Sequence, residues 1–238
     1  YRTNLAVTFF DGADDIQPWN RSTRTGLRQE LTIEHVMASS SIPIFFPAIS
    51  IDGHYYADGC VRLTTPLSPA IHLGADRILA IGVRSRSAPV PPDGRERYPR
   101  VAETAGLLLN ALFLEALEID VERFERINHT LSLVPRAHLT SDPSPLRSIP
   151  LLVLRPSQDP ARFAADAIGR LPYLVQHLFR GLGVTHEIGA DLLSYLAFDP
   201  TYTSQLLALG YADTIAKRDA VLKFLRPEVY ATDVLFAK

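Results

Sequence analysis

A strand, a turn, a helix and a second strand follow one another in the first part of the chain. Of all features of the sequence, this order of elements most restricts the folds that the chain can adopt. Thr64 or Thr65 can cap a helix that has Pro66 at its first position. Gly74 is suited to end that helix, and the apolar run 77–83 predicts the second strand. A unit of this kind belongs to a parallel sheet covered by helices, so the sequence predicts an α/β fold.

Hydrophobic periodicity predicts further elements along the whole chain. Before the first unit we expect a strand over 5–10, a helix over 31–40 and a hairpin over 49–55 that turns at Asp52 and Gly53. After it we expect helices over 101–127, 159–170, 172–182, 188–198, 200–209 and 213–225, short strands over 130–134 and 151–154, and loops over 85–99 and 135–150. The chain therefore divides into residues 1–88 and a mostly helical remainder, 89–238, packed on them.

The long helix over 101–127 is amphipathic. The apolar residues expected to share its packing face are Ala105, Leu108, Leu112 and Ile119.

Composition excludes several classes of protein. The net charge of -2 on 238 residues gives no general attraction to nucleic acid. One cysteine, Cys60, allows no internal disulfide, and it fits a reducing compartment. No apolar run approaches the roughly 20 residues that span a bilayer. We therefore expect a soluble, cytoplasmic protein whose membrane contact, if any, is peripheral.

Asp58 and Gly59 form the candidate catalytic motif. Asp-Gly pairs also occur at residues 11–12, 52–53 and 93–94, so the dipeptide alone favours a turn. Asp58, however, leaves an apolar strand and precedes a capped helix, where parallel sheets present reactive groups. Its setting therefore favours chemistry over turn formation alone.

The chain resembles the patatin-like phospholipases of bacterial type, a family of lipid acyl hydrolases. The pattern that carries the resemblance runs over residues 5–84 and comprises Ala38, Ser39, Ile42, Pro43, Phe46, Pro47, Asp58, Gly59, Pro66 and Gly74 to Ile81. Residues 193–200 and 209–211 look like the helical tail of such proteins. The resemblance implies a three-layer α/β fold, a parallel sheet between helices, with a mostly helical C-terminal extension.

The resemblance also implies a serine esterase that uses a Ser-Asp dyad and needs no cofactor. Asp58 would be the general base, with Gly59 and Cys60 in its supporting loop. The family's serine and glycine-rich loop lie upstream of the matched part, and Gly-x-Ser-x-Gly occurs nowhere in the chain. We therefore expect that catalysis needs an N-terminal segment outside this chain and that the partner is a lipid or phospholipid substrate. The family usually has glycine or alanine at the position of Cys60 and asparagine at that of Thr64.

Other interpretations of these residues remain open. Cys60 is either a small buried side chain or a nucleophile. The serines 39–41 either end a helix or supply a hydroxyl nucleophile, although they lack flanking glycines. The seven histidines show no metal spacing, and the arginines between 84 and 100 either meet anionic lipid or lie in a solvated loop. The alternative function is that of a lipid-binding or regulatory protein that retains the fold without catalysis.

Overall fold

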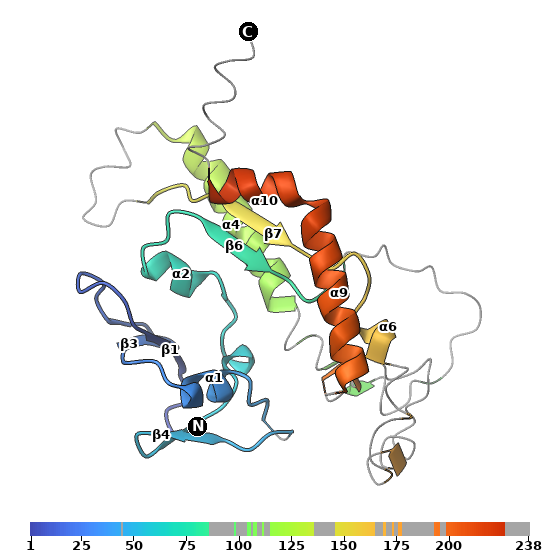
Figure 1. Ribbon diagram of the computed structural model, residues 1–238. Helices are drawn as coiled ribbons and strands as arrows, with labels where there is room; N and C mark the ends of the chain where they lie inside the picture. The colour runs from blue at the N-terminus through green and yellow to red at the C-terminus, as the bar shows by residue number, and fades with distance from the viewer. Residues whose placement is uncertain are drawn as a thin grey trace. The chain divides into compact units, whose positions relative to one another are not determined.

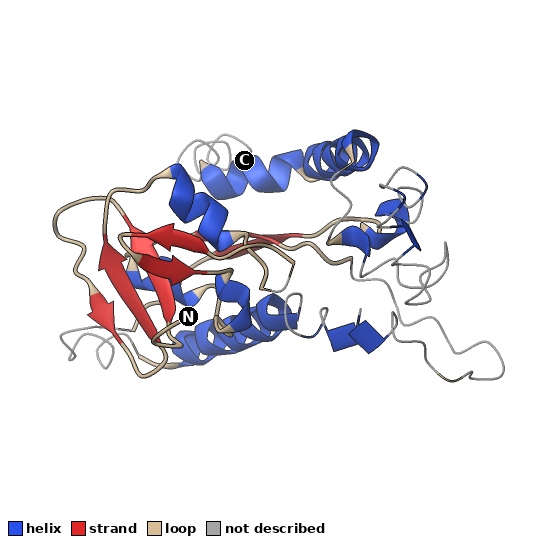
Figure 2. Ribbon diagram, turned by 90° about the horizontal axis from the view of Figure 1, so that it is seen from below, coloured by secondary structure: helices blue, strands red, loops and turns tan. Residues whose placement is uncertain are grey.

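The computed structural model describes residues 1–43, 45–85, 115–135, 146–164 and 199–226, together with residues 98, 104, 105, 107, 108, 111, 169, 173, 176, 177 and 193–195 (Figures 1 and 2). Its contacts group the chain into two compact units. Unit 1 contains residues 1–78 and 115–150, and unit 2 contains residues 79–114 and 151–238. The boundary expected after residue 88 stays a prediction.

Unit 1 begins with a three-stranded sheet in the order β1-β3-β2, made of β1 (Ala6–Phe10), β2 (Trp19–Asn20) and β3 (Arg24–Arg28). Strand β1 runs parallel to β3, with Ala6 opposite Arg24, and β2 runs antiparallel to β3. The apolar run over 5–10 correctly predicted β1. The sequence did not predict β2 and β3, because these strands are short and polar and lack an apolar alternation.

Helix α1 (Ile33–Ser39) and the hairpin of β4 (Ile49–Ile51) and β5 (His54–Tyr56) confirm two predicted elements. Both turn residues have the positive φ that a two-residue hairpin requires, 49° at Asp52 and 75° at Gly53. Figure 1 shows the hairpin next to α1. The fixed register of this hairpin determines where the chain leaves β5.

The segment after β5 forms a short 3₁₀ turn, η1 (Gly59–Val61), and then helix α2 (Ser68–His72). The helix begins two residues later than predicted and has Pro69, rather than Pro66, in its first turn. Gly74 follows its end with φ 87°, a conformation that favours glycine. The helix and its stop signal are therefore confirmed, while its cap is not a threonine.

Helix α4 (Glu115–Leu133) shows that the predicted strand over 130–134 is wrong, because residues 130–133 continue the helix. The buried residues Val121, Phe124 and Leu131 lie at helical spacing, which extends the apolar face to the last turn. The predicted packing face is also wrong at Leu108 and Ile119, which are 59% and 55% exposed.

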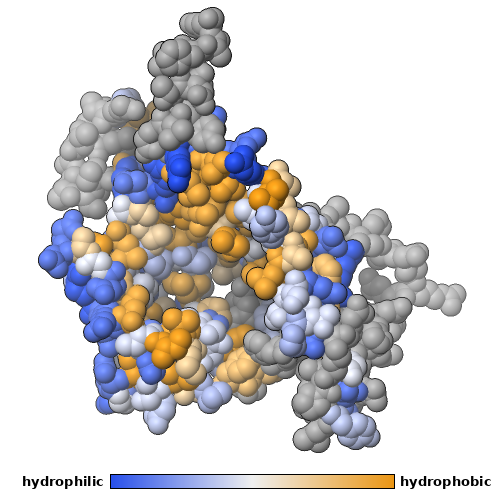
Figure 3. Space-filling model, viewed as in Figure 1, coloured by the Kyte–Doolittle hydropathy of each residue, from blue (hydrophilic) through white to orange (hydrophobic). Residues whose placement is uncertain are grey.

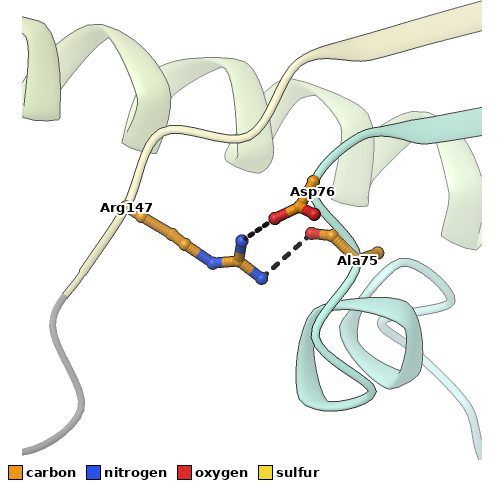
Figure 4. A network of polar contacts seen from close by, with 3 residues as sticks. All are labelled: Ala75, Asp76 and Arg147. Atoms are coloured by element: carbon orange, nitrogen blue, oxygen red, sulfur yellow. Dashed lines mark hydrogen bonds and ion pairs between the residues drawn. The ribbon is translucent and has the colours of Figure 1, made fainter.

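Two contacts attach the segment before β7 (Leu151–Leu154) to the rest of unit 1. Asn128 of α4 donates to the carbonyl of Ile149 at 2.8 Å and accepts its N–H at 3.1 Å. The guanidinium of Arg147 donates to the carboxylate of Asp76 at 2.6 Å and to the carbonyl of Ala75 at 3.0 Å (Figure 4).

Strand β6 (Ile78–Ile81) pairs with β7, and both were predicted. The N–H of Ile78 donates to the carbonyl of Pro150, and that of Gly82 donates to the carbonyl of Leu154. The partners advance in the same direction on both strands, so the pair is parallel.

Unit 2 contains helices α6 (Ala161–Ala164), α9 (Pro200–Ala216) and α10 (Arg218–Leu225). Asp199 caps α9 by accepting the N–H groups of Thr201 and Tyr202. The break predicted after residue 209 is wrong, since α9 continues through Gly210 and ends before Lys217.

The described elements form a mixed α/β fold with two parallel strand pairs, β1 with β3 and β6 with β7. Several expected elements lie outside the described residues. They are the helices over 172–182 and 188–198 except for isolated positions, most of 101–114, residues 165–170 apart from 169, and most of the loops over 85–99 and 135–150. Among the helices described, none combines the length and the hydropathy that crossing a bilayer demands.

Candidate active site

Asp58 is held at the start of turn η1, two residues after β5. Its N–H donates to the carbonyl of Ser41 at 2.9 Å, which ties it to the end of helix α1. Its carboxylate Oδ1 accepts the N–H of Cys60 at 2.9 Å. The side chain is partly buried. The predicted base is therefore fixed by its own backbone and by the turn that follows it.

Cys60 is a protonated thiol beside this carboxylate. Burial raises its pKa well above the ordinary value, and the hydrogen bond to Asp58 and the negative charge of that carboxylate raise it further. Only the thiolate is a strong nucleophile. The surroundings of Cys60 therefore favour the small buried side chain over the nucleophile.

Gly59 leaves the surface next to Asp58 open. The residue is exposed, and a Cβ built on it meets no atom within 4 Å. Its φ lies outside the range that favours glycine. Neither strain nor packing in the described residues requires glycine here, so no described atom covers the space beside Gly59.

The three serines 39–41 end helix α1. The hydroxyls of Ser39 and Ser40 donate to the carbonyl of Val36 at 2.9 and 3.0 Å, and that of Ser41 donates to the carbonyl of Met37 at 2.7 Å. Through such bonds the hydroxyls donate to carbonyl groups of the last helical turn, which lack the N–H partners of the helix interior. This geometry supports the interpretation as a helix terminus.

Aromatic contacts bring the loop that follows β5 and carries Asp58, here called the Asp58 loop, to the carboxyl end of β1. The ring of Phe9 lies edge-on to the ring of Tyr56, with centroids 5.2 Å apart, and edge-on to the ring of His35 at 4.7 Å. Asp58 follows Tyr56 by two residues. The carboxyl ends of parallel strands are where α/β proteins place their reactive groups.

Sequence reasoning missed Asp120, which is buried on helix α4. Its Oδ2 accepts the N–H of Leu67 at 2.9 Å, immediately before helix α2. Burial raises the pKa of Asp120, while the bond to Leu67 and the nearby charges of Arg123 and Arg24 partly oppose this. The sequence contained one signal for this role, since Asp120 is a charged residue among the apolar positions of α4.

Residues near this region also include Thr64 and Thr65. Thr64 is exposed. The hydroxyl of Thr65 accepts a hydrogen bond from the guanidinium of Arg24.

The described part of the chain contains no group of three or more histidine, cysteine, aspartate or glutamate side chains that could hold a metal ion. The arginines at 86, 95, 97 and 100, considered for contact with anionic lipid, lie outside the described residues.

One comparison with known proteins found a similar family. Searches of curated proteins and of solved structures gave no match. A family model described as patatin-like phospholipase matches residues 3–71. The match includes β1, helix α1 and the Asp58 loop, whereas residues 74–81 and 193–211 lie beyond it. Over residues 3–71 the chain is therefore similar to the patatin-like phospholipases, which agrees with the resemblance described above.

Proposed function

We propose that Asp58 is the general base of a lipid acyl hydrolase that cleaves carboxylic esters. The observation that carries this proposal is the position of its carboxylate. Asp58 is fixed by hydrogen bonds to Ser41 and Cys60 at a partly buried site, next to the open surface at Gly59. This site lies inside the segment that matches the patatin-like phospholipases.

The nucleophile in this proposal is a serine on polypeptide outside the chain, since the motif Gly-x-Ser-x-Gly occurs nowhere in the 238 residues. Asp58 accepts the hydroxyl proton as the serine oxygen attacks the ester carbonyl. The protonated carboxyl then gives this proton to the departing alcohol, which leaves an acyl-serine. Water attacks the acyl-serine with Asp58 again as the base, releasing the fatty acid and restoring the serine. No cofactor takes part.

The same family suggests the rest of the architecture. We propose a three-layer arrangement in which a parallel sheet lies between helices, with a helical C-terminal extension. The parallel pairing of β1 with β3 and of β6 with β7, and the helices α9 and α10, support this proposal. The substrate is a lipid or phospholipid, which the protein meets by peripheral contact with a membrane.

A second candidate function is that of a lipid-binding or regulatory protein without catalysis. The lack of a Gly-x-Ser-x-Gly sequence in the chain favours it. The presence of a reactive serine in the product of the intact gene distinguishes the two functions.

The test is labelling of the intact gene product with a fluorophosphonate probe, together with ester turnover. We expect labelling of one serine, and a loss of turnover of about 10²- to 10⁴-fold in Asp58→Asn, the range typical of a removed general base. Asparagine keeps an oxygen that can accept the N–H of Cys60, so the turn is preserved.

Asp52→Asn is the matched control. Asp52 is exposed in the hairpin turn, and asparagine tolerates its positive φ. This variant should retain wild-type turnover. An unlabelled gene product, or equal turnover in Asp58→Asn and Asp52→Asn, refutes the proposed mechanism.

A further inference from the structure

Helix α9 has an outward side that carries no charge. Of its 17 residues, Asp213 alone is charged, and its carboxylate accepts the N–H of Ser157 at 2.8 Å. Tyr202, Leu206 and Leu209 lie on the same side of the helix as Asp213, and all four residues are buried or half-buried. The opposite side of α9 therefore presents only uncharged side chains.

Three large side chains form a mainly apolar stripe on that outward side. Leu207, Tyr211 and Ile215, here called the α9 stripe, are 75%, 73% and 50% exposed. They follow one another at intervals of four residues, which places them on one face of the helix. Figure 3 shows mainly orange and pale side chains over α9. Because a helix that is apolar on both sides is usually covered on both sides, the α9 stripe is typical of a surface that contacts an apolar partner.

Basic residues cluster at the end of the α9 stripe. Lys217 separates α9 from α10, and the following residues add Arg218, Lys223 and Arg226. All four basic residues are exposed. The one acidic residue in this stretch of sequence is Asp219, whose Oδ1 lies 3.7 Å from the guanidinium of Arg218. Positive charge therefore exceeds negative charge where α9 meets α10.

An apolar stripe beside an excess of positive charge matches the surface of a membrane that contains anionic lipid. Interfacial helices bury apolar side chains at the level of the headgroups, and lysine and arginine beside them attract anionic headgroups. Tyrosine is common at this depth, because its ring is apolar and its hydroxyl is polar. On the basis of the proposed function, which requires access to lipid, we propose that the α9 stripe and the basic residues at its end dock the protein on an anionic membrane surface.

A second copy of the chain fits this surface less well. The stripe runs from Leu207 to Ile215, which is about 12 Å of helix. Three side chains over that length cover much less than the roughly 800 Å² per partner that a stable protein interface buries. A second copy would also bring the same positive charge, whereas an anionic membrane supplies the opposite charge and needs no matching shape.

The test is co-sedimentation of the intact gene product with lipid vesicles. We expect binding to vesicles of phosphatidylcholine mixed with phosphatidylserine, and weaker binding to vesicles of phosphatidylcholine alone. Binding to the mixed vesicles should weaken as the salt concentration rises, because salt screens exposed charges. Fluorophosphonate labelling of the same preparation reports separately on the proposed function.

Two double variants test the two parts of the surface. Leu207→Gln with Ile215→Gln removes apolar area but keeps good helix formers, and it should lower the affinity for mixed vesicles by about tenfold or more. Lys217→Gln with Lys223→Gln should lower that affinity by about 25-fold, since each basic residue near an anionic surface contributes about fivefold. The second variant should also make binding less sensitive to salt.

Leu133→Gln and Arg126→Gln on helix α4 are the matched controls. Leu133 is 72% exposed, and Arg126 is also exposed. Neither residue belongs to the proposed surface, so both variants should bind mixed vesicles as the wild type does. Losses in these controls as large as those in the double variants would overturn the proposal.

The remaining outcomes separate the docking surface from the proposed function. Labelled protein that binds neither kind of vesicle, or that binds mixed vesicles equally well in the wild type and in both double variants, overturns the docking surface and leaves the proposed function standing. Equal binding to both kinds of vesicle also overturns it. A dimer in sedimentation that Leu207→Gln with Ile215→Gln dissociates would mean a second copy and would overturn the proposal. Binding through this surface in protein that no fluorophosphonate labels would support docking while contradicting the proposed function.

Discussion

At the scale of single residues, Asp58 and Cys60 act on each other. The carboxylate accepts hydrogen bonds from Cys60 and raises the pKa of its thiol, but burial is the larger cause of that shift. A thiol in this setting stays neutral and helps to keep the charged oxygen of Asp58 in place. Cys60, where patatin-like phospholipases usually have a small residue, is thus compatible with the role proposed for Asp58.

Alkylation measures this effect. Because the pKa of Cys60 is raised, we expect iodoacetamide at pH 8 to react with the folded protein at least tenfold more slowly than with the protein in guanidinium chloride. Asp58→Asn removes the charge and should recover part of the rate, since burial remains. Equal rates for folded and unfolded protein would contradict the raised pKa.

The same thiol makes stability depend on pH. The unfolded chain releases the thiol proton near pH 9, the ordinary value, whereas the folded chain retains it. The free energy of unfolding should therefore fall as the pH rises above about 9. Denaturation of wild type and Cys60→Ser in urea at pH 8 and pH 10 measures this, and the decrease should be smaller in the serine variant. The same pH dependence in both proteins would assign the decrease to other groups.

The sequence predicted the local surroundings of some candidate residues and missed those of others for physical reasons. The position of Asp58 just after a strand was predictable, because a strand end and a following glycine are local features. Asp120 was not, since its role depends on contact with Leu67, 53 positions away. The unpaired Nε2 of His35 depends likewise on the packing of α1 against Phe9.

At the scale of elements, a ring stack secures the first sheet. Trp19 stacks between the rings of Phe10 and His72, with centroids 5.4 and 5.1 Å away. Gly26 lies beneath it, where a Cβ would approach the indole to 2.4 Å. Neighbours on both sides restrict any movement of the indole away from β3.

Gly26→Ala should therefore destabilise the protein by about 1–3 kcal/mol, the usual cost of overpacking. Gly210→Ala is the control, because a Cβ there meets no atom within 4 Å and the residue lies inside helix α9. That change should stabilise the protein by up to about 1 kcal/mol. Urea denaturation compares the two, and equal stabilities would contradict the close contact with Trp19.

Element prediction succeeded where periodicity was local and strong. The strand over 151–154 and the hairpin turn at Asp52 and Gly53 have the predicted positions. Strand β3 was not predicted, because pairing with β1 rather than its own sequence makes Arg24–Arg28 extended. The helical residues 130–133 were mistaken for a strand, since a short apolar run fits both structures.

At the scale of the whole molecule, unit 1 is assembled from distant segments of the chain. Asp120 joins helix α4 to the start of α2 through a buried hydrogen bond. Arg147 and Asp76 join the later segment to the earlier one at the surface, where the two side chains are 43% and 87% exposed. These two contacts should differ in energy because only the first is shielded from water.

Asp120→Ala should cost about 1–3 kcal/mol, because it leaves the N–H of Leu67 buried without an acceptor. Asp76→Ala should cost less than about 1 kcal/mol, as exposed ion pairs do. Equal losses in urea denaturation would contradict the distinction between the buried and the exposed contact.

The raised pKa of Asp120 makes the stability of the protein depend on pH. The folded protein retains this proton above the pH at which the unfolded chain loses it, so the contribution of this group to stability decreases as the pH rises from 3 to 7. The stability of wild type relative to Asp120→Asn should therefore be greater at pH 3 than at pH 7. The opposite order would mean that the hydrogen bond from Leu67 outweighs burial.

Under the proposed function, the bond between the Asp58 N–H and the Ser41 carbonyl affects how the nucleophile should be sought. Because the Ser41 hydroxyl shapes the end of α1, replacing it with alanine would shift the aspartate and lower the catalytic rate. A serine-by-serine mutational survey would then register a false positive at a residue whose hydroxyl is bonded to a carbonyl of its own helix. Mass spectrometry of the covalently trapped acyl-enzyme identifies the true nucleophile without this error.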